Sequence, residues 1–128
     1  MEFPTNRTRK IITEGSCAYG MFAGLGEPAL VEMMGYAGLD FVVIDTEHSG
    51  NTMEQVYALT RAAEVSGITP IMRVTENSPG MILRALDAGA AGVLVPQVNS
   101  AEEAAAVVRA ARYAPQGERG LAGVVRAA

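Results

Sequence analysis

The sequence predicts an α/β protein built from four successive β/α units with parallel strands. Short apolar runs alternate with longer segments of helical character, and this pattern repeats at a spacing of roughly 25 residues. The run Phe41–Asp45 has no polar interruption before its last residue, which indicates a strand buried on both faces. Glycine and proline separate the segments, as turns require. Together these observations predict strands joined by right-handed helical crossovers.

The individual elements follow from periodicity and boundary residues. A short charged helix is predicted first, over Asn6–Glu14. Four strands are predicted, at Ala18–Ala23, Phe41–Asp45, Thr69–Val74 and Gly92–Pro96. Four helices are predicted after them, at Ala29–Tyr36, Thr52–Ser66, Ser78–Ala88 and Ser100–Tyr113. The tail, Gly117–Ala128, is predicted to be a loop.

Two of these helices begin with residues typical of a capping box. In each box a Ser or Thr precedes a Gln or Glu by three positions, as Thr52 precedes Gln55 and Ser100 precedes Glu103. Gly67 follows the second helix of the repeat and is predicted to end it.

Length and composition fit one domain. The chain has 128 residues, of which 49% are apolar and 5% aromatic, so aliphatic side chains must fill the core. Four β/α units are about half of a (β/α)₈ barrel, which typically needs about 250 residues. An open four-stranded sheet covered by helices on both faces is the other architecture that this length allows.

Charge and apolar runs limit the kinds of partner. The net charge is −4 and no basic run is present, which argues against a nucleic-acid partner. No apolar run approaches the roughly 18–20 residues of a membrane span. The single cysteine, Cys17, cannot form an internal disulfide, so a cytoplasmic location is expected.

Ionisable and polar side chains follow the predicted strands at their carboxyl ends. The second strand ends in Asp45, Glu47 and His48, the third in Arg73, and the fourth is followed by Gln97. Because parallel strands bring these ends to one edge, we expect the side chains to converge. An aspartate can orient a histidine, and a guanidinium fits a carboxylate. The sequence therefore predicts a site for a small acid with a proton-transfer group.

Simpler structural roles remain open for the same residues. His48 could be a surface residue, Asp45 could cap local backbone, and Arg73 could form a structural ion pair with Glu47. Neither a dinucleotide-binding glycine pattern nor a P-loop occurs. The chain also has too few His and Cys residues for a zinc site, so no metal ligands are assigned.

A set of ordered motifs extends over almost the whole chain. The motifs are Gly38–Phe41, Ile44–His48, Pro70–Val74, Ile82–Ala90, Leu94–Val98, Ala111–Gly120 and Arg126–Ala127. In these motifs and their spacing the chain resembles the HpcH/HpaI aldolases, also called class II pyruvate aldolases. The resemblance implies a (β/α)₈ TIM barrel, assembled as a homo-oligomer, usually a hexamer. It also implies a lyase that reversibly cleaves a 4-hydroxy-2-oxo acid to pyruvate and an aldehyde.

The resemblance assigns roles to residues of this chain. His48 matches the histidine that moves the proton of the 4-hydroxyl, and Asp45 matches the aspartate that orients it. Arg73 matches the arginine that steadies the developing enolate oxygen, and we expect Gln97 to contact the substrate beside it. Glu47 is expected near metal-bound water. The metal of the family is Mg²⁺, Mn²⁺ or Co²⁺, which polarises the 2-oxo acid.

The chain departs from the family at the metal ligands. In the family these are a glutamate and an aspartate on later strands, and nothing in this sequence matches them. We therefore expect a single partial (β/α)₈-barrel domain over residues 1–128, truncated after about four β/α units, with little activity of its own. The alternatives are a non-catalytic half-barrel that associates through exposed strand edges, and a small α/β domain that binds carboxylates.

Overall fold

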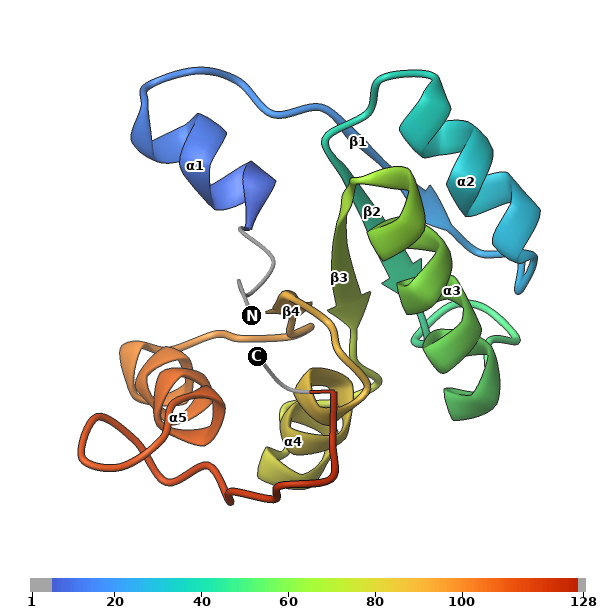
Figure 1. The fold of residues 1–128 in the computed structure, drawn as a ribbon. Coiled ribbons are helices and arrows are strands. Elements are labelled where there is room, and N and C mark those ends of the chain that lie inside the picture. The colour runs from blue at the N-terminus through green and yellow to red at the C-terminus, as the bar shows by residue number, and fades with distance from the viewer. Residues whose placement is uncertain (1–5, 127–128) are drawn as a thin grey trace.

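The computed structural model describes residues 6–126 as alternating helices and strands (Figure 1). The strands are β1 (Gly20–Ala23), β2 (Phe41–Asp45), β3 (Thr69–Arg73) and β4 (Gly92–Leu94). The helices are α1 (Arg7–Thr13), α2 (Pro28–Tyr36), α3 (Met53–Ser66), α4 (Pro79–Asp87) and α5 (Ala101–Ala111). Every predicted element is present in the predicted order. The tail is a loop as far as Arg126, and its last residues, Ala127 and Ala128, lie outside the described residues.

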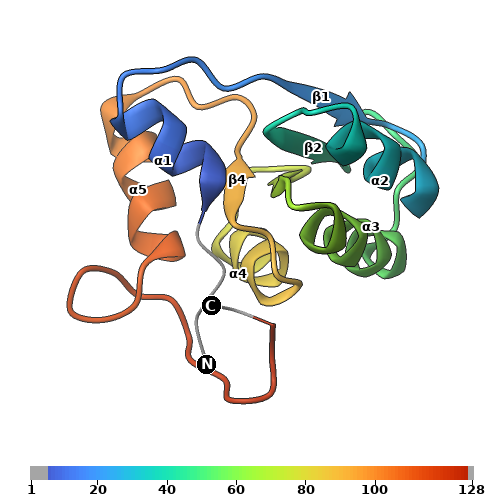
Figure 2. The same ribbon diagram turned by 45° about the horizontal axis from the view of Figure 1, so that its top comes forward.

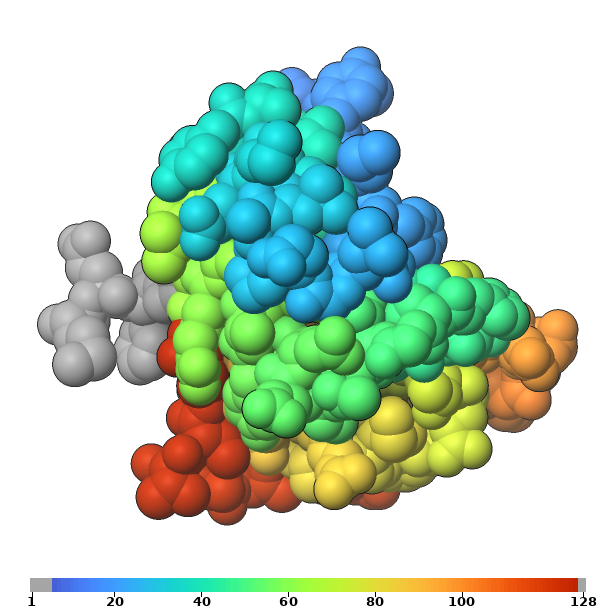
Figure 3. All heavy atoms as spheres, turned by 90° about the vertical axis from the view of Figure 1, so that its right-hand side faces the viewer, coloured from blue at the N-terminus to red at the C-terminus, as the bar shows by residue number. Residues whose placement is uncertain are grey.

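All four strands lie parallel in one sheet, in the order β1-β2-β3-β4. Helices α2, α3 and α4 follow one another around the outside of this sheet (Figure 2). From the side of α2 and α3, helical side chains cover most of the sheet (Figure 3). This is the arrangement that four consecutive units of a barrel would have, rather than a sheet with helices on both faces.

The core lies between the sheet and these outer helices. Ile44, Met72, Leu59 and Ala85 are fully buried there, two from strands and two from helices. The opposite face of the sheet is more open, and Phe22 on β1 keeps 52% of its surface exposed. The strands are thus buried on the helical side and only partly covered on the side that would face a barrel interior.

Helix α1 fastens the amino-terminal ends of the strands. The Asn6 side chain caps α1 and donates a hydrogen bond to Ala91 O just before β4. Thr8 donates through its hydroxyl to Asp40 O, and its backbone N–H donates to the Thr69 hydroxyl. The leading helix is therefore part of the tertiary structure.

Some boundaries differ from the prediction. Strand β4 ends at Leu94 rather than Pro96, since proline has no N–H for the ladder. Helix α5 ends at Ala111 because Arg112 is extended. The capping box at Thr52 forms in full, whereas at Ser100 only the hydroxyl half forms and the Glu103 carboxylate accepts from Asn99 N–H instead. Among residues 6–126, none of the helices is long and apolar enough to cross a membrane.

Candidate functional site at the carboxyl ends of β2 and β3

The centre of the site is an ion pair between two neighbouring strands. Asp45 and Arg73 are register partners in the parallel β2–β3 ladder. Arg73 donates from Nε to Asp45 Oδ1 over 2.8 Å and from Nη2 to Asp45 Oδ2 over 2.6 Å. The fork is therefore bidentate, a geometry that fixes both groups. The alignment of the two strands alone brings these residues together.

The carboxylate of Asp45 also organises the loop that follows β2. Its Oδ1 accepts hydrogen bonds from the backbone N–H groups of Glu47 and His48, over 2.9 Å and 3.2 Å. The hydrogen bonds from Arg73, helped by these backbone donors and opposed by burial, lower the pKa of Asp45 to about 2. Asp45 is therefore ionised at neutral pH and serves as a fixed acceptor.

Arg73 is held from three sides but keeps free donors. Its Nη1 lies 3.2 Å from Glu47 Oε2, and its guanidinium carbon lies 5.0 Å from the centre of the Phe22 ring. The hydrogen bond to Asp45 raises the pKa of Arg73 above its ordinary value. A guanidinium has five N–H donors, and three contacts with carboxylates leave two. The side chain is 20% exposed, so these donors can meet a ligand.

His48 lies at the edge of this network. Its Nε2 is 3.7 Å from Glu47 Oε1, and 73% of the side chain is exposed. Asp45 accepts a hydrogen bond from the backbone N–H of His48. Any effect of Asp45 on the imidazole therefore depends on how it positions this loop and on Glu47. Gln97 follows β4 in a left-handed conformation (φ 55°) and is exposed. Among the described residues, Gln97 forms no hydrogen bond with the other candidate site residues, which are Asp45, Glu47, His48 and Arg73.

Asn51 is a residue that the sequence analysis missed. It is 9% exposed, and its side-chain amide donates to Ala23 O over 3.0 Å and to Asp45 O over 2.8 Å. It thus ties the carboxyl end of β1 to that of β2. The Asn51 Oδ1 atom is buried and has no hydrogen-bond partner among residues 6–126. The only signal in the sequence was an Asn next to the Thr52 cap, which is common in loops.

The structural roles left open at the sequence level are present here. Asp45 does accept local backbone N–H groups, and Arg73 does pair with Glu47. These contacts hold the residues in place and leave part of Arg73 and most of His48 accessible. Within residues 6–126 no group of three His, Cys, Asp or Glu side chains could hold a metal ion. Because Asp45 and Glu47 face Arg73, they do not form a metal site by themselves.

Comparison with known proteins gives the family. The model of the HpcH/HpaI aldolase/citrate lyase family matches residues 18–127. The chain belongs to this family. A hydroxypyruvate/pyruvate aldolase from Agrobacterium fabrum is 39% identical over 125 residues, which are 98% of this chain and 47% of that protein. The chain spans about half the length of the curated relatives it matches.

Solved structures of similar proteins share the fold. A family protein from Burkholderia cenocepacia superposes with a TM-score of 0.88 at 34% identity, over 96% of this chain and 51% of that one. The citrate synthase SbnG superposes with a TM-score of 0.86 at 39% identity, over 91% of this chain and 48% of that one. The predicted fold class is confirmed: the four β/α units are half of the TIM barrel of the HpcH/HpaI family.

Proposed function

We propose that this chain forms the acid-binding and proton-transfer side of an aldolase site. The reaction is the reversible cleavage of a 4-hydroxy-2-oxo acid to pyruvate and an aldehyde. One observation carries the proposal: Asp45 and Glu47 hold Arg73 at the carboxyl ends of two adjacent strands, with an accessible His48 beside it. The similarity to proteins named hydroxypyruvate/pyruvate aldolases supports it.

Arg73 binds and stabilises the oxygen atoms of the 2-oxo acid. Its two remaining N–H donors are available to bind a ligand whose negative charge grows on oxygen as the enolate forms. Asp45 and Glu47 prevent the guanidinium from turning away, so little reorganisation is needed during the reaction. We assign Gln97 a weaker role, as a polar contact to the substrate from the neighbouring loop.

His48 transfers the proton. As a neutral imidazole it removes the proton of the 4-hydroxyl, the C3–C4 bond breaks, and the electron pair moves to the C2 carbonyl to form the enolate. The aldehyde leaves, and transfer of the proton from the imidazolium to C3 gives pyruvate and restores the neutral imidazole. Glu47, 3.7 Å from Nε2, stabilises the imidazolium formed in the first step. Asp45 fixes the loop that carries both residues.

A divalent metal and a homo-oligomer, such as a hexamer, belong to the proposal through the family resemblance. Mg²⁺, Mn²⁺ or Co²⁺ would supply polarisation of the substrate carbonyl. The described residues offer no ligand set for such a metal. A cytoplasmic location is likewise a proposal.

The test measures pyruvate released from a 4-hydroxy-2-oxo acid, with each metal in turn. We expect slow turnover from the 128-residue chain, reduced about 10²–10⁴-fold by His48→Ala. Glu76→Gln, an exposed change in the loop after β3, is the matched control and should leave the rate unchanged. An equal rate in His48→Ala would contradict the assigned proton transfer.

A second candidate is carboxylate binding without turnover. The observation that favours it is that Arg73 keeps free donors while His48 has only a 3.7 Å contact to Glu47. Pyruvate binding that is lost in Arg73→Lys, with no pyruvate release under any metal condition, would favour this candidate over the aldolase.

A further inference from the structure

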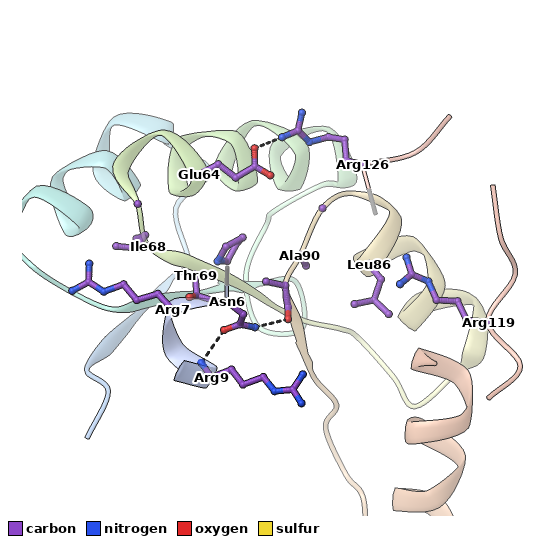
Figure 4. Close-up of a pocket in the computed structure, with 14 residues that line it drawn as sticks. Asn6, Arg7, Arg9, Glu64, Ile68, Thr69, Leu86, Ala90, Arg119 and Arg126 are labelled. Atoms are coloured by element: carbon purple, nitrogen blue, oxygen red, sulfur yellow. Dashed lines mark hydrogen bonds and ion pairs between the residues drawn. The ribbon is translucent and has the colours of Figure 1, made fainter. Parts of the chain in front are cut away.

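The amino-terminal ends of β3 and β4 border a cavity of about 370 Å³ (Figure 4). Arginine side chains line it without surrounding one point, since the ends of Arg9 and Arg126 lie on opposite sides in Figure 4. Arg126 pairs there with Glu64, and Arg119 pairs with Asp87. Among residues 6–126, the side chains of this cavity therefore do not converge on a second ligand. The carboxyl edge of the sheet is different, because one buried side chain connects its parts.

That side chain, Asn51, joins β1 to β2 where their backbone ladder stops. The last register pair of the two strands is Ala23 with Ile44. Just beyond this pair, the Asn51 amide donates to Ala23 O over 3.0 Å and to Asp45 O over 2.8 Å. Both N–H donors of the amide are thus used, and their acceptors stand at the ends of two different strands. The spacing between these strand ends is therefore set by one side chain.

The same residue closes the loop that carries His48. The Asn51 backbone N–H donates to Ser49 Oγ over 3.1 Å, and the Ser49 hydroxyl donates to Asp45 O. Asp45 O thus accepts from Ser49 and from the Asn51 amide, while the Asp45 carboxylate accepts from the backbone N–H of His48. His48 therefore lies between two points at which the loop is tied to the end of β2.

The end of β1 matters for Arg73 because of Phe22. The centre of the Phe22 ring lies 5.0 Å from the guanidinium carbon of Arg73, within the range of a cation–π contact. Asn51 holds β1 at the next residue, through Ala23 O. A shift of β1 against β2 would therefore move the ring over the guanidinium and change the surroundings of the donors that Arg73 keeps free.

Burial strengthens this bridge and also leaves a cost. Asn51 is 9% exposed, so water hardly competes for its two hydrogen bonds. The loop after β1 packs over it at Gly26, where a Cβ would lie 3.1 Å from Asn51 Oδ1. Among residues 6–126, Oδ1 has no hydrogen-bond partner, and an unpaired buried acceptor lowers stability. This cost indicates that the placement of the two donors matters more here than complete hydrogen bonding does.

We propose that Asn51 is a positioning residue of the aldolase site. It fixes the end of β1 against that of β2 and closes the loop, and so keeps the imidazole of His48 beside the free donors of Arg73. Asn51 is buried and acts through these two residues. The inference rests on the proposed aldolase function, because His48 and Arg73 are the groups that the reaction uses.

The first experiment measures pyruvate release by the full 128-residue chain and by Asn51→Ala and Asn51→Asp. Aspartate has the shape of asparagine but no N–H donors, so it separates hydrogen bonding from packing. We expect kcat to fall about tenfold or more in both variants, because the loop that carries His48 is loosened. KM should change by less than about twofold, since Asp45 and Glu47 still hold Arg73.

Ile68→Val is the matched control. Ile68 is buried directly before β3, at the opposite edge of the sheet, and the loss of a methyl group there lowers stability without a contact to the candidate site. Circular dichroism sets a temperature at which every variant is folded. The control should then keep kcat and KM unchanged. An equal fall of kcat in Ile68→Val would show that Asn51 acts through stability alone and would overturn the proposal.

A second experiment needs no turnover. In a ¹⁵N-labelled chain, the heteronuclear NOE of the His48 amide reports the order of the loop. The shift of the Arg73 Nε–H signal reports the position of the Phe22 ring beside it. Asn51→Ala should lower the NOE and shift the Arg73 signal, whereas Ile68→Val should change neither.

Ser49→Ala separates the two effects of the bridge. It removes a donor to Asp45 O within the loop but keeps the bond from Asn51 to Ala23 O. The NOE of the His48 amide should therefore fall while the Arg73 signal stays in place. Unchanged signals in a folded Asn51→Ala chain would overturn the proposal. Failure of both Asn51 variants to fold would also overturn it, because the role of Asn51 would then be purely structural.

The two experiments distinguish failure of the positioning from failure of the aldolase function. If the unmodified chain releases no pyruvate, the aldolase function is contradicted, and the NMR signals still decide whether Asn51 positions Arg73 and His48. Pyruvate release with an unchanged kcat in Asn51→Ala would contradict the positioning alone.

Discussion

The two edges of the sheet use arginine in different ways. At the carboxyl edge, Arg73 contacts Asp45 through two nitrogens and Glu47 through the third. At the amino edge, three arginines each contact one carboxylate through one nitrogen. The first arrangement fixes a single guanidinium in one orientation. The second spreads single contacts over three guanidiniums, of which Arg7 and Arg126 are partly exposed and Arg119 is buried. Fixed donors suit a reaction centre, because they need little reorganisation as charge develops on the substrate.

The two edges also differ in how the chain assembles them. Asp45 and Arg73 meet because their strands pair in register. At the amino edge, Asn6 reaches Ala91 and Glu64 reaches Arg126, contacts that join segments 85 and 62 residues apart. Substitutions at the carboxyl edge should therefore lower the free energy of unfolding more than substitutions at the amino edge. Four experiments test this difference.

The largest effect is expected for Asn51→Ala. The substitution removes the donor to Ala23 O and Asp45 O, so it should lower the free energy of unfolding by about 2 kcal/mol. Urea denaturation measures this loss. Asn77→Ala, at an exposed loop position, should change the free energy by less than about 0.5 kcal/mol. Equal effects of the two variants would show that Asn51 does not hold the strand ends together.

Gly26→Ala should cost about 1 kcal/mol, because a Cβ there would lie 1.9 Å from Gln55 Nε2 and displace the side chain that caps α3. Gly24→Ala is the matched control on the same loop. A Cβ at Gly24 meets only Ser49 Cβ, at 3.9 Å. Thermal melting of both variants gives the comparison, and a Gly24 variant as unstable as the Gly26 variant would contradict it.

Lowering the pH should weaken the ion pair between Asp45 and Arg73 at the carboxyl edge over a defined pH range. The pKa of Asp45 is lowered to about 2 in the folded chain, while its ordinary value is 3.8. The stabilisation of the folded chain by ionised Asp45 is therefore complete above about pH 4 and is lost as the pH falls toward about 2. The melting midpoints of the unmodified chain and Asp45→Asn should differ most above about pH 4 and converge below it. A constant difference across this range would refute the assignment.

The smallest effect is expected at the amino edge. Arg126→Gln breaks a partly exposed ion pair with Glu64 and should lower the free energy of unfolding by less than about 1 kcal/mol. Adding about 0.5 M NaCl should remove even that difference, because salt screens exposed charges. Chemical denaturation at two salt concentrations measures it. A larger, salt-independent loss would mean that the two edges do not differ as described.

Much of the carboxyl edge could be predicted from the sequence. The run Phe41–Asp45 marked a buried strand, and the polar residues after it had to lie at its carboxyl end. Parallel pairing then placed Arg73 beside Asp45. The role of Asn51 could not be predicted, since its partners are backbone carbonyls whose positions no side-chain pattern records. The half-formed box at Ser100 arose because Asn99 competed for the Glu103 carboxylate.

The sequence by itself determined the alternation of strands and helices, because apolar periodicity, caps and glycine stops act within a few residues. It also determined which ionisable groups stand at the strand ends. Only the tertiary structure decided that Asp45 holds Arg73 while His48 turns to Glu47. It alone gathered arginines from α1 and the tail around one cavity. Those contacts join segments that are far apart in the sequence, and no short stretch of sequence records how such segments pack against one another.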